Sequence, residues 1–389
     1  MPGHRGYHAW YMLNVRGACR VVMLAVVGLG LWTPGASAQS VSVVLPASGP
    51  AADAWQALEA GRLREAERLF AGARAATPDD TAVLLGSAVV ARRLGQGVSA
   101  RQWLTRALQI DPSLSAASML LATLSREAGD LETALRVYDA ALVRAPEHPE
   151  LKAGAESCRT ELGRLTRWPG DLGGETRLFF DGPVDEATAR LALESAARAR
   201  ERIGAALGVT PADRVTVVLV TSPAEAPPVA AVPEWSTSQF DGRVRMQVRP
   251  PVKDRAEFER MLTHEYAHAV LRTVAPSGVP AWLNEGFATW LEPGGLKRAE
   301  RDLRAAGVLL PWPRLQESFA SLPPAAVTAA YAQSALGVAV MISRAGIPAV
   351  LAMMRDLAAG ETLDGALRSR IGLSVEEFQR EFLASLRIP

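Results

Sequence analysis

Two of the five histidines in the chain lie four residues apart, in the segment HEYAH that spans residues 264–268. On a helix, His264 and His268 would stand on the same side one turn apart. Two imidazoles placed in this way can direct nitrogen atoms at one metal ion about 2.0–2.1 Å away. Glu265 lies next to that side, so its carboxylate would be beside the ion. This H-E-x-x-H pattern indicates hydrolysis by a metal-activated water.

A third metal ligand is predicted downstream of the histidines. After Pro276, Gly278 and Pro280 interrupt the chain, the segment AWLNEGFATW begins a new helix with Glu285 in its first turns. A carboxylate that returns antiparallel, 17 positions after His268, would complete a His2Glu site with one open position. The third ligand matters, because H-E-x-x-H alone arises by chance in roughly one protein in a hundred of this length.

The helix that carries the histidines has its own start signal. Pro250 and Pro251 end the preceding segment, and Asp254 followed by Glu257 is a variant of the capping box. The apolar residues that follow have helical spacing and predict a buried stripe, formed by Phe258, Met261, Leu262, Ala269 and Leu271.

The elements around this helix change in type along the chain. Upstream the pattern is mixed: residues 176–180 and 214–222 predict strands, residues 184–207 a helix, and the alternating residues 242–248 an exposed or edge strand. Downstream it is helical, with helices predicted at 324–345, 347–359 and 361–369, and a last one opened by a capping box of Ser374 and Glu377.

An internal repeat of period 34 precedes these elements. A turn glycine, two small alanines, one large residue and one proline recur in three rows, as Gly61, Gly95 and Gly129; Ala66, Ala100 and Ala134; Phe70, Leu104 and Tyr138; Ala73, Ala107 and Ala141; and Pro78, Pro112 and Pro146. The period and the columns resemble the tetratricopeptide repeat. Gly163 continues the glycine column, and residues 147–163 predict a capping helix. We expect the array to bind a protein partner; a spacer is the alternative.

The segment pair HEYAH and WLNEGFA resembles the gluzincin metallopeptidases over roughly residues 175–360. Within them it resembles the peptidase MA-like domains often found behind tetratricopeptide repeats in exported bacterial proteins. The resemblance implies that His264, His268 and Glu285 hold Zn²⁺. It implies that Glu265 is the general base, which takes a proton from the attacking water and passes it to the leaving amine. Tyr331 matches a tyrosine of the family pattern that would stabilise the oxyanion; a tyrosine buried at a helix contact is the alternative.

Two departures from related enzymes bear on the prediction. Aminopeptidases with the WLNEGFA segment carry an upstream Gly-x-Met-Glu-Asn strand, whereas residues 242–248 are GRVRMQV and lack the glutamate. This disfavours an aminopeptidase. Thr289 stands where thermolysin-like enzymes place an aspartate that orients a histidine, so another acceptor is expected here. The aromatic residues Trp282, Phe287 and Trp290 are expected to be core.

The N-terminus has the three parts of a secretory signal peptide. Residues 1–20 are basic and contain no acid, residues 21–32 are apolar, and an A-x-A pattern ends at Ala38. We predict cleavage after Ala38 and export to the periplasm or the exterior of a bacterial cell. The apolar run is shorter than the about 20 residues that cross a bilayer, and cleavage after Ala38 would remove it. No membrane span is therefore expected in the processed chain. An uncleaved anchor is the alternative.

Composition sets the class of protein. The chain is 49% hydrophobic and 21% charged with a net charge of +1, which is typical of globular domains and gives no reason to expect nucleic acid as a partner. The predicted divisions are a signal peptide at 1–38, three tetratricopeptide repeats with a capping helix at 47–165, a linker at 166–175 and a peptidase MA-like domain at 176–389.

These patterns together predict an α-helical tetratricopeptide solenoid followed by an α+β zincin-like metallopeptidase domain with a helical C-terminal half. The expected function is that of an exported zinc-dependent peptidase acting on a peptide or protein substrate, with repeats that bind a protein partner or the substrate. The alternative is a tetratricopeptide adaptor whose peptidase-like domain binds without cleaving. Intact Glu265 favours the enzyme, because a domain that has lost catalysis would be expected to lose its general base.

Overall fold

The structure is a computed structural model, and it divides into two compact units, Met1–Leu162 and Gly163–Pro389. The residues that it describes are 12–13, 19–26, 39–46, 50–169, 175–209, 214–221, 243–319 and 322–386. The predicted cleavage site at Ala38 lies outside the described residues, and so do residues 170–174 of the predicted linker.

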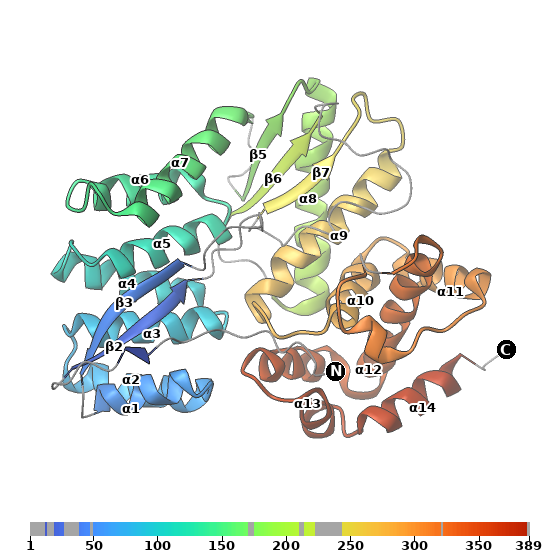
Figure 1. The fold of residues 1–389 in the computed structure, drawn as a ribbon. Helices are drawn as coiled ribbons and strands as arrows, with labels where there is room; N and C mark the ends of the chain where they lie inside the picture. The colour runs from blue at the N-terminus through green and yellow to red at the C-terminus, as the bar shows by residue number, and fades with distance from the viewer. Residues whose placement is uncertain are drawn as a thin grey trace. The chain divides into compact units, whose positions relative to one another are not determined.

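The first unit consists of helical hairpins followed by one further helix (Figure 1). The helices are α1 (Pro50–Glu59), α2 (Leu63–Ala76), α3 (Thr81–Arg93), α4 (Gly97–Ile110), α5 (Ser115–Glu127), α6 (Leu131–Leu142) and α7 (Pro149–Arg164). The repeat glycines Gly61, Gly95 and Gly129 have φ angles of 74°, 76° and 70°, which confirms that they make the turn within each hairpin. Gly163, which continues the glycine column, lies inside α7, the helix at the position predicted for the capping helix.

The other columns of the repeat form the contacts between helices. The alanines Ala66, Ala100 and Ala134 are completely buried, as expected where helices approach closely. Phe70 is also completely buried and packs edge-on against Trp55 of α1, with ring centroids 5.5 Å apart. The period predicted from the sequence therefore corresponds to one helical hairpin per repeat.

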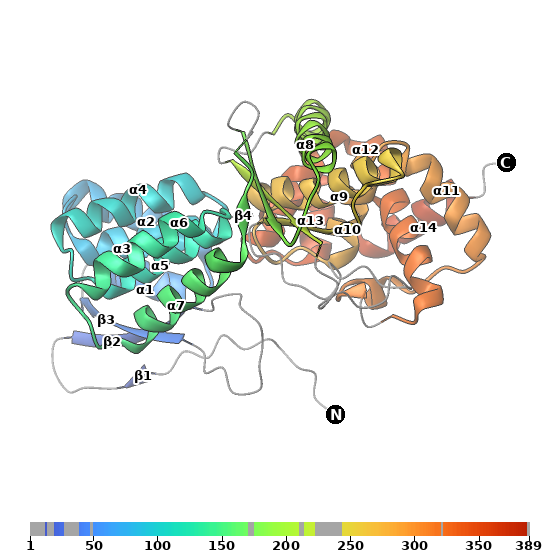
Figure 2. The same ribbon diagram turned by 90° about the horizontal axis from the view of Figure 1, so that it is seen from above.

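The first unit also contains a small antiparallel sheet in the order β1-β2-β3. Its strands are β1 (Met12–Leu13), β2 (Cys19–Val26) and β3 (Gln39–Pro46). β3 packs against α1, α3 and α5, and Figure 2 shows the sheet along that side of the helices. Part of the apolar run predicted as a signal peptide is thus a strand, β2, paired with β3. Cleavage after Ala38 would remove β1 and β2 and leave β3.

The second unit begins with a sheet in the order β4-β5-β6-β7. Its strands are β4 (Thr166–Arg167), β5 (Thr176–Asp181), β6 (Val215–Val220) and β7 (Arg243–Gln247), of which β5, β6 and β7 run parallel. The linker prediction was therefore wrong at Thr166 and Arg167, which pair with β5 instead of forming loop. β7 ends the described sheet, as predicted, but Arg243 on its polar side is buried.

The other elements described in the second unit are helices, packed around a large apolar core and a smaller apolar cluster. They are α8 (Glu186–Leu207), α9 (Arg255–Val274), α10 (Ala281–Leu291), α11 (Gly295–Ala306), α12 (Pro324–Ala358), α13 (Leu363–Arg370) and α14 (Val375–Ser385), with a 3-10 turn at Trp312–Leu315. Asp254 caps α9 by accepting from the Glu257 amide, and Ser374 and Glu377 form the predicted capping box of α14. α11 was not predicted, and it contributes to the site below.

The longest helix, α12, is broken at one residue. Gly346 has a φ of 79°, which separates two helical segments at the predicted position. Within Ala326–Ala358 the helix is long and apolar enough to cross a membrane, a criterion that buried core helices also meet. In the structure α12 packs against α10, α11 and α13, so it is the central helix of the second unit. It carries Tyr331 toward α9 and α10.

Candidate metal centre

The three predicted ligands meet between α9 and α10. The Nε2 atoms of His264 and His268 lie 3.3 Å apart. Glu285 Oε2 lies 3.3 Å from the first nitrogen and 3.4 Å from the second. The three atoms thus form a nearly equilateral triangle, which we call the ligand triangle. Because α9 places the histidines one turn apart and α10 returns beside it, the local fold alone brings these atoms together.

The ligand triangle has the dimensions of a zinc site. Ligand atoms about 2.0–2.1 Å from a tetrahedral ion are about 3.3–3.4 Å from one another. All three sides of the triangle fall at these lengths. Two imidazole nitrogens and one carboxylate oxygen are also a donor set that zinc favours. The residues present therefore fit Zn²⁺ in both chemistry and spacing.

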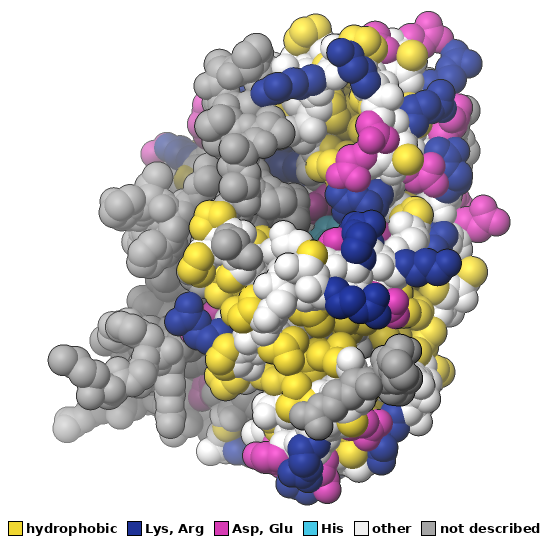
Figure 3. All heavy atoms as spheres, turned by 90° about the vertical axis from the view of Figure 1, so that its right-hand side faces the viewer, with side chains coloured by type: hydrophobic (Ala, Val, Ile, Leu, Met, Phe, Trp, Pro, Cys, Tyr) yellow, Lys and Arg dark blue, Asp and Glu magenta, His cyan; other side chains and the backbone are white. Residues whose placement is uncertain are grey.

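The site is enclosed but not sealed from solvent. The side chains of His264 and His268 are 6% and 9% exposed, and that of Glu285 is 16% exposed. Figure 3 shows histidine atoms at the bottom of a recess bordered by acidic and basic side chains. A small polar molecule can therefore reach the triangle, while most of the charge around it is removed from water.

Sequence reasoning missed the residue that orients His264. Glu292, at the end of α10, accepts a hydrogen bond from His264 Nδ1 over 2.7 Å. Its own side chain is 1% exposed. The other carboxylate oxygen accepts from Arg260 Nη1 at 3.0 Å and from Arg298 Nη2. Glu292 thus takes the role that Thr289 cannot fill, since the buried Thr289 hydroxyl has no hydrogen-bond partner among the described residues.

This hydrogen bond decides which nitrogen of His264 faces the triangle with a lone pair. Burial raises the pKa of Glu292, but His264, Arg260 and Arg298 outweigh it and hold that pKa below its ordinary value. Glu292 is therefore a carboxylate, and the shared proton belongs to His264 Nδ1. In the neutral imidazole, Nε2 is then the acceptor. His264 is oriented to offer that lone pair to an ion.

A short backbone connection makes the contact between Glu292 and Arg298 possible. Gly294 has a φ of 67° at the start of α11. A side chain on Gly295 would meet the Thr289 carbonyl oxygen at 1.9 Å, so α11 can begin this close to α10 only with glycine there. The sequence EPGG was thus the available signal for a sharp return after Glu292.

Charges in the triangle shift one another's protonation. Burial alone would raise the pKa of Glu285, but His268 and His264 lower it to about 2. Burial would lower the pKa of His264, but Glu285 and Glu292 raise it to about 10. Without an ion, a proton therefore resides on His264 and not on the carboxylate. The carboxylates of Glu285 and Glu292 thus favour a positive charge between them, which in the metal-free protein is the protonated His264.

Glu265 and Tyr331 lie beside the triangle. Burial raises the pKa of Glu265, although His268 and His264 oppose the shift. The ring of Tyr331 stands 6.0 Å from that of His264, edge to face. Burial, with the nearby Glu285 and Glu265, raises the pKa of Tyr331. The predicted general base thus has a pKa moved toward neutrality, and the tyrosine keeps its proton.

A glycine controls how closely Tyr331 approaches. A side chain on Gly286, next to Glu285, would meet the Ser334 carbonyl oxygen of α12 at 2.5 Å. The absence of that side chain lets the backbones of α10 and α12 touch one turn from Tyr331. The glycine of the segment WLNEGFA therefore has a packing role that places α12 against the site.

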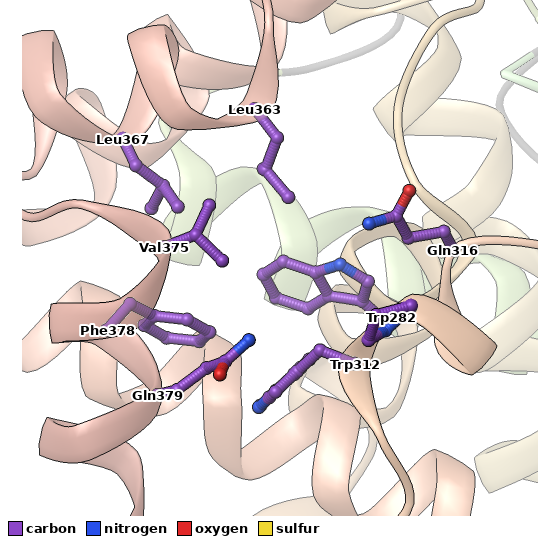
Figure 4. A pocket seen from close by; sticks show the side chains of 9 residues that line it. Trp282, Trp312, Gln316, Leu363, Leu367, Val375, Phe378 and Gln379 are labelled. Carbon is purple, nitrogen blue, oxygen red and sulfur yellow. The ribbon is translucent and has the colours of Figure 1, made fainter.

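The aromatic residues of α10 are core, as predicted. Trp282 is 1% exposed and stacks on Phe378 with ring centroids 5.6 Å apart, while Phe287 is fully buried and Trp290 is partly buried. Trp282 also lines a mainly apolar pocket shown in Figure 4, whose other members include Trp312 and Gln316. None of the triangle residues lines this pocket.

Comparison with known proteins concerns the repeats. A tetratricopeptide repeat family model matches residues 57–124, which run from the end of α1 into α5. This match agrees with the period of 34 and with the helical hairpins, and such repeats generally mediate interactions between proteins. A search of the curated proteins found no match to the chain.

Proposed function

We propose that this chain is an exported zinc-dependent peptidase of the gluzincin type, with a peptidase MA-like domain in its second unit. The observation that carries the proposal is the ligand triangle, with sides of 3.3, 3.3 and 3.4 Å and with His264 oriented by Glu292. An ordinary buried ion pair needs no such convergence of three atoms. A tetrahedral ion does.

The residues of the triangle would hold the ion, and those beside it would handle protons. Zinc in such a site lowers the pKa of water toward neutrality and polarises a carbonyl group. Glu265 would accept a proton from the attacking water, helped by a pKa that burial raises. It would then return this proton to the nitrogen of the leaving amine. This assigns to Glu265 both halves of the proton transfer in amide hydrolysis.

Tyr331 would donate a hydrogen bond to the carbonyl oxygen as negative charge develops on it. Its hydroxyl group is buried near Glu265 and Glu285, and its raised pKa keeps the proton available for donation. A donor that is fixed before the reaction stabilises an oxyanion without having to reorganise. This makes the catalytic interpretation of Tyr331 preferable to a purely structural one.

The remaining parts of the proposal concern location and partners. The basic, apolar and A-x-A segments up to Ala38 support cleavage and export to the periplasm or the cell exterior. The repeats support binding of a protein, either the substrate or a separate partner. The alternative function is an adaptor that binds a protein without cleaving it, and the same repeats favour it. In the adaptor Glu265 would not act as a general base.

The experiment that separates these functions is a cleavage assay on a broad peptide library. Wild-type protein loaded with zinc is compared with Glu265→Gln, with the exposed Glu300→Gln as a matched control on α11. We expect cleavage by the wild type and by Glu300→Gln, and none by Glu265→Gln at unchanged zinc content. A wild type that holds zinc and cuts nothing would support the adaptor, and an active Glu265→Gln protein would exclude this glutamate as the base.

A further inference from the structure

Gln333 of α12 is a buried polar residue that the proposed reaction does not use. It is 1% exposed. Its Oε1 atom accepts a hydrogen bond from the backbone N–H of Leu310 over 2.8 Å, and its Nε2 atom donates to the carbonyl oxygen of the same residue over 2.9 Å. We call this pair of hydrogen bonds the Gln333 clamp. Residues 307–311 have no regular secondary structure, so the clamp gives both backbone groups of Leu310 a partner.

A second contact lies one turn further along α12. A side chain on Gly337 would meet the ring of Trp312 at 2.6 Å, so the indole lies directly against the helix backbone. Trp312 also packs against Phe378 and Phe382 of α14, with ring centroids 5.0 and 5.2 Å away. Residues 310–312 are thus hydrogen-bonded to α12 at one turn and packed onto its backbone at the next.

The apolar contacts on this side of α12 are made mostly by small residues. Ala329, Ala332 and Ala335 are buried in one cluster with Ala299 and Leu303 of α11. Small side chains interlock little, and apolar contacts alone leave a packed element less uniquely placed. Hydrogen bonds are directional, and breaking the clamp would leave buried polar groups without partners. The clamp therefore favours one rotation of α12 about its axis.

Tyr331 stands on the opposite side of the same helix. Residues two positions apart on an α-helix are separated by about 200° around the axis, so Gln333 points to Leu310 and Tyr331 points to the ligand triangle. The ring of Tyr331 lies 6.0 Å from that of His264 and 5.1 Å from that of Phe319. A rotation of α12 by about 10° would move an atom about 6 Å from the axis by about 1 Å. A displacement of about 1 Å can lower a rate about 10²-fold.

We infer that Gln333 is a positioning residue for Tyr331. By holding Leu310, the clamp fixes the rotation of α12 and with it the place of the tyrosine hydroxyl beside the ligand triangle. The inference rests on the proposed function for what this hydroxyl does, and on the contacts above for where it lies. The contact at Gly286 limits the distance between α10 and α12, whereas Gln333 controls rotation, so the two residues restrain different movements of one helix.

Fluorine NMR on protein made with meta-fluorotyrosine reports the surroundings of Tyr331 without any assay of cleavage. The resonance that is missing from Tyr331→Phe identifies this residue. Gln333→Met keeps the length of the side chain but removes both hydrogen bonds of the clamp, so the Tyr331 resonance should broaden or move by more than its linewidth. Gln379→Met makes the same change at a partly buried glutamine of α14, in the pocket of Figure 4, and should leave the resonance in place.

Kinetics then test the link to the reaction. With zinc bound, Gln333→Met should lower kcat about 10–10²-fold at unchanged KM and zinc content, and Gln379→Met should keep wild-type kcat. Normal kcat in Gln333→Met beside a shifted resonance would overturn the positioning role. A wild type that cleaves nothing would contradict the proposed function alone, because the resonance still decides whether Gln333 fixes the place of Tyr331.

The structural part of the inference has its own contrary results. An unmoved Tyr331 resonance in Gln333→Met would overturn it, and so would equal shifts in Gln333→Met and Gln379→Met. Fast hydrogen exchange of the Leu310 amide in the wild type would show that the clamp does not form. Gln333→Asn, whose amide is too short to bond both groups of Leu310, is a second variant and should give a smaller shift. Loss of helix content in both variants, measured by circular dichroism, would mean that Gln333 supports the whole unit and not the rotation of one helix.

Discussion

His264 Nδ1 lies 2.7 Å from Glu292 Oε1, although 28 positions separate the two residues. Two arginines hold the far oxygen of Glu292, Arg260 from the helix of the histidines and Arg298 from α11. The orientation of the first predicted ligand thus depends on three helices. Because this contact fixes the orientation of His264, the geometry of the ligand triangle does not depend on its three side chains alone.

The first prediction concerns metal content. The purified protein should hold about one zinc per chain, and His264→Ala or His268→Ala should abolish tight binding because each removes one of three protein ligands. Glu285→Ala should weaken binding strongly. His148→Ala, in the repeats, is the control and should retain full zinc. Elemental analysis after dialysis measures this, and full zinc in all three site variants would place the metal elsewhere.

Glu292 should tune zinc affinity without touching the ion. Glu292→Ala removes the acceptor for His264 Nδ1 and leaves Arg260 and Arg298 without their common partner, so zinc affinity should fall about 10–100-fold. Glu292→Gln keeps an oxygen acceptor and should lose less. Competition with a chromogenic chelator measures the affinities. Unchanged binding in Glu292→Ala would show that the orientation of His264 is fixed by packing alone.

Zinc binding should release a proton. The pKa of His264 is raised to about 10 in the metal-free protein, so at pH 8 the Nε2 proton must leave before zinc can bind. Because the folded pKa is raised, apparent zinc affinity should increase with pH up to about 10, by at most about tenfold per unit. Titration calorimetry in two buffers that differ in ionisation enthalpy measures the proton count.

A matched variant makes the proton prediction specific. Glu292→Gln removes one of the two carboxylates that raise the pKa of His264, so fewer protons should be released at pH 8 than in the wild type. Heat of binding that does not depend on the buffer in the wild type would contradict the raised pKa.

Tyr331 should act on the rate and not on substrate affinity. Tyr331→Phe removes the hydroxyl that would donate to the oxyanion, and kcat should fall about 10²–10³-fold while KM and zinc content stay unchanged. Tyr138→Phe, at a buried tyrosine of the repeats, is the control and should keep wild-type kcat. A Tyr331→Phe enzyme with normal kcat would leave this residue with a packing role only.

Gly286 should be intolerant of a methyl group. In Gly286→Ala the new atom would meet the Ser334 carbonyl at 2.5 Å, so α12 must shift. We expect a loss of stability of about 1–3 kcal/mol, together with lower activity. Gly72→Ala in α2 has open space around it and should be neutral or stabilising by up to about 1 kcal/mol. Thermal unfolding compares the two, and similar behaviour would refute the close contact.

The two units differ in how much of their structure can be predicted from the sequence. The repeat was predictable because one glycine per hairpin must turn at a positive φ and one large residue must fill each groove. The small sheet that contacts these helices was not predicted, because its strands lie outside the period of the repeat. In the site, His264 and His268 follow from helical spacing alone. Glu292 was missed because its contact depends on the tight return at Gly295, which a helical pattern does not encode.

The residues of the proposed site come from two separate parts of the chain, and this bears on the order in which the site can form during folding. The ligand triangle and its supports come from α9, α10 and the start of α11, which are consecutive and joined by short connections, so they can form as a local unit. Tyr331 arrives only with α12. A folding chain could thus capture its ion, and gain the stability of that cross-link, before it acquires the oxyanion donor. The proposed cleavage activity would then be completed last, after the segments that could serve as its own substrates have had time to fold.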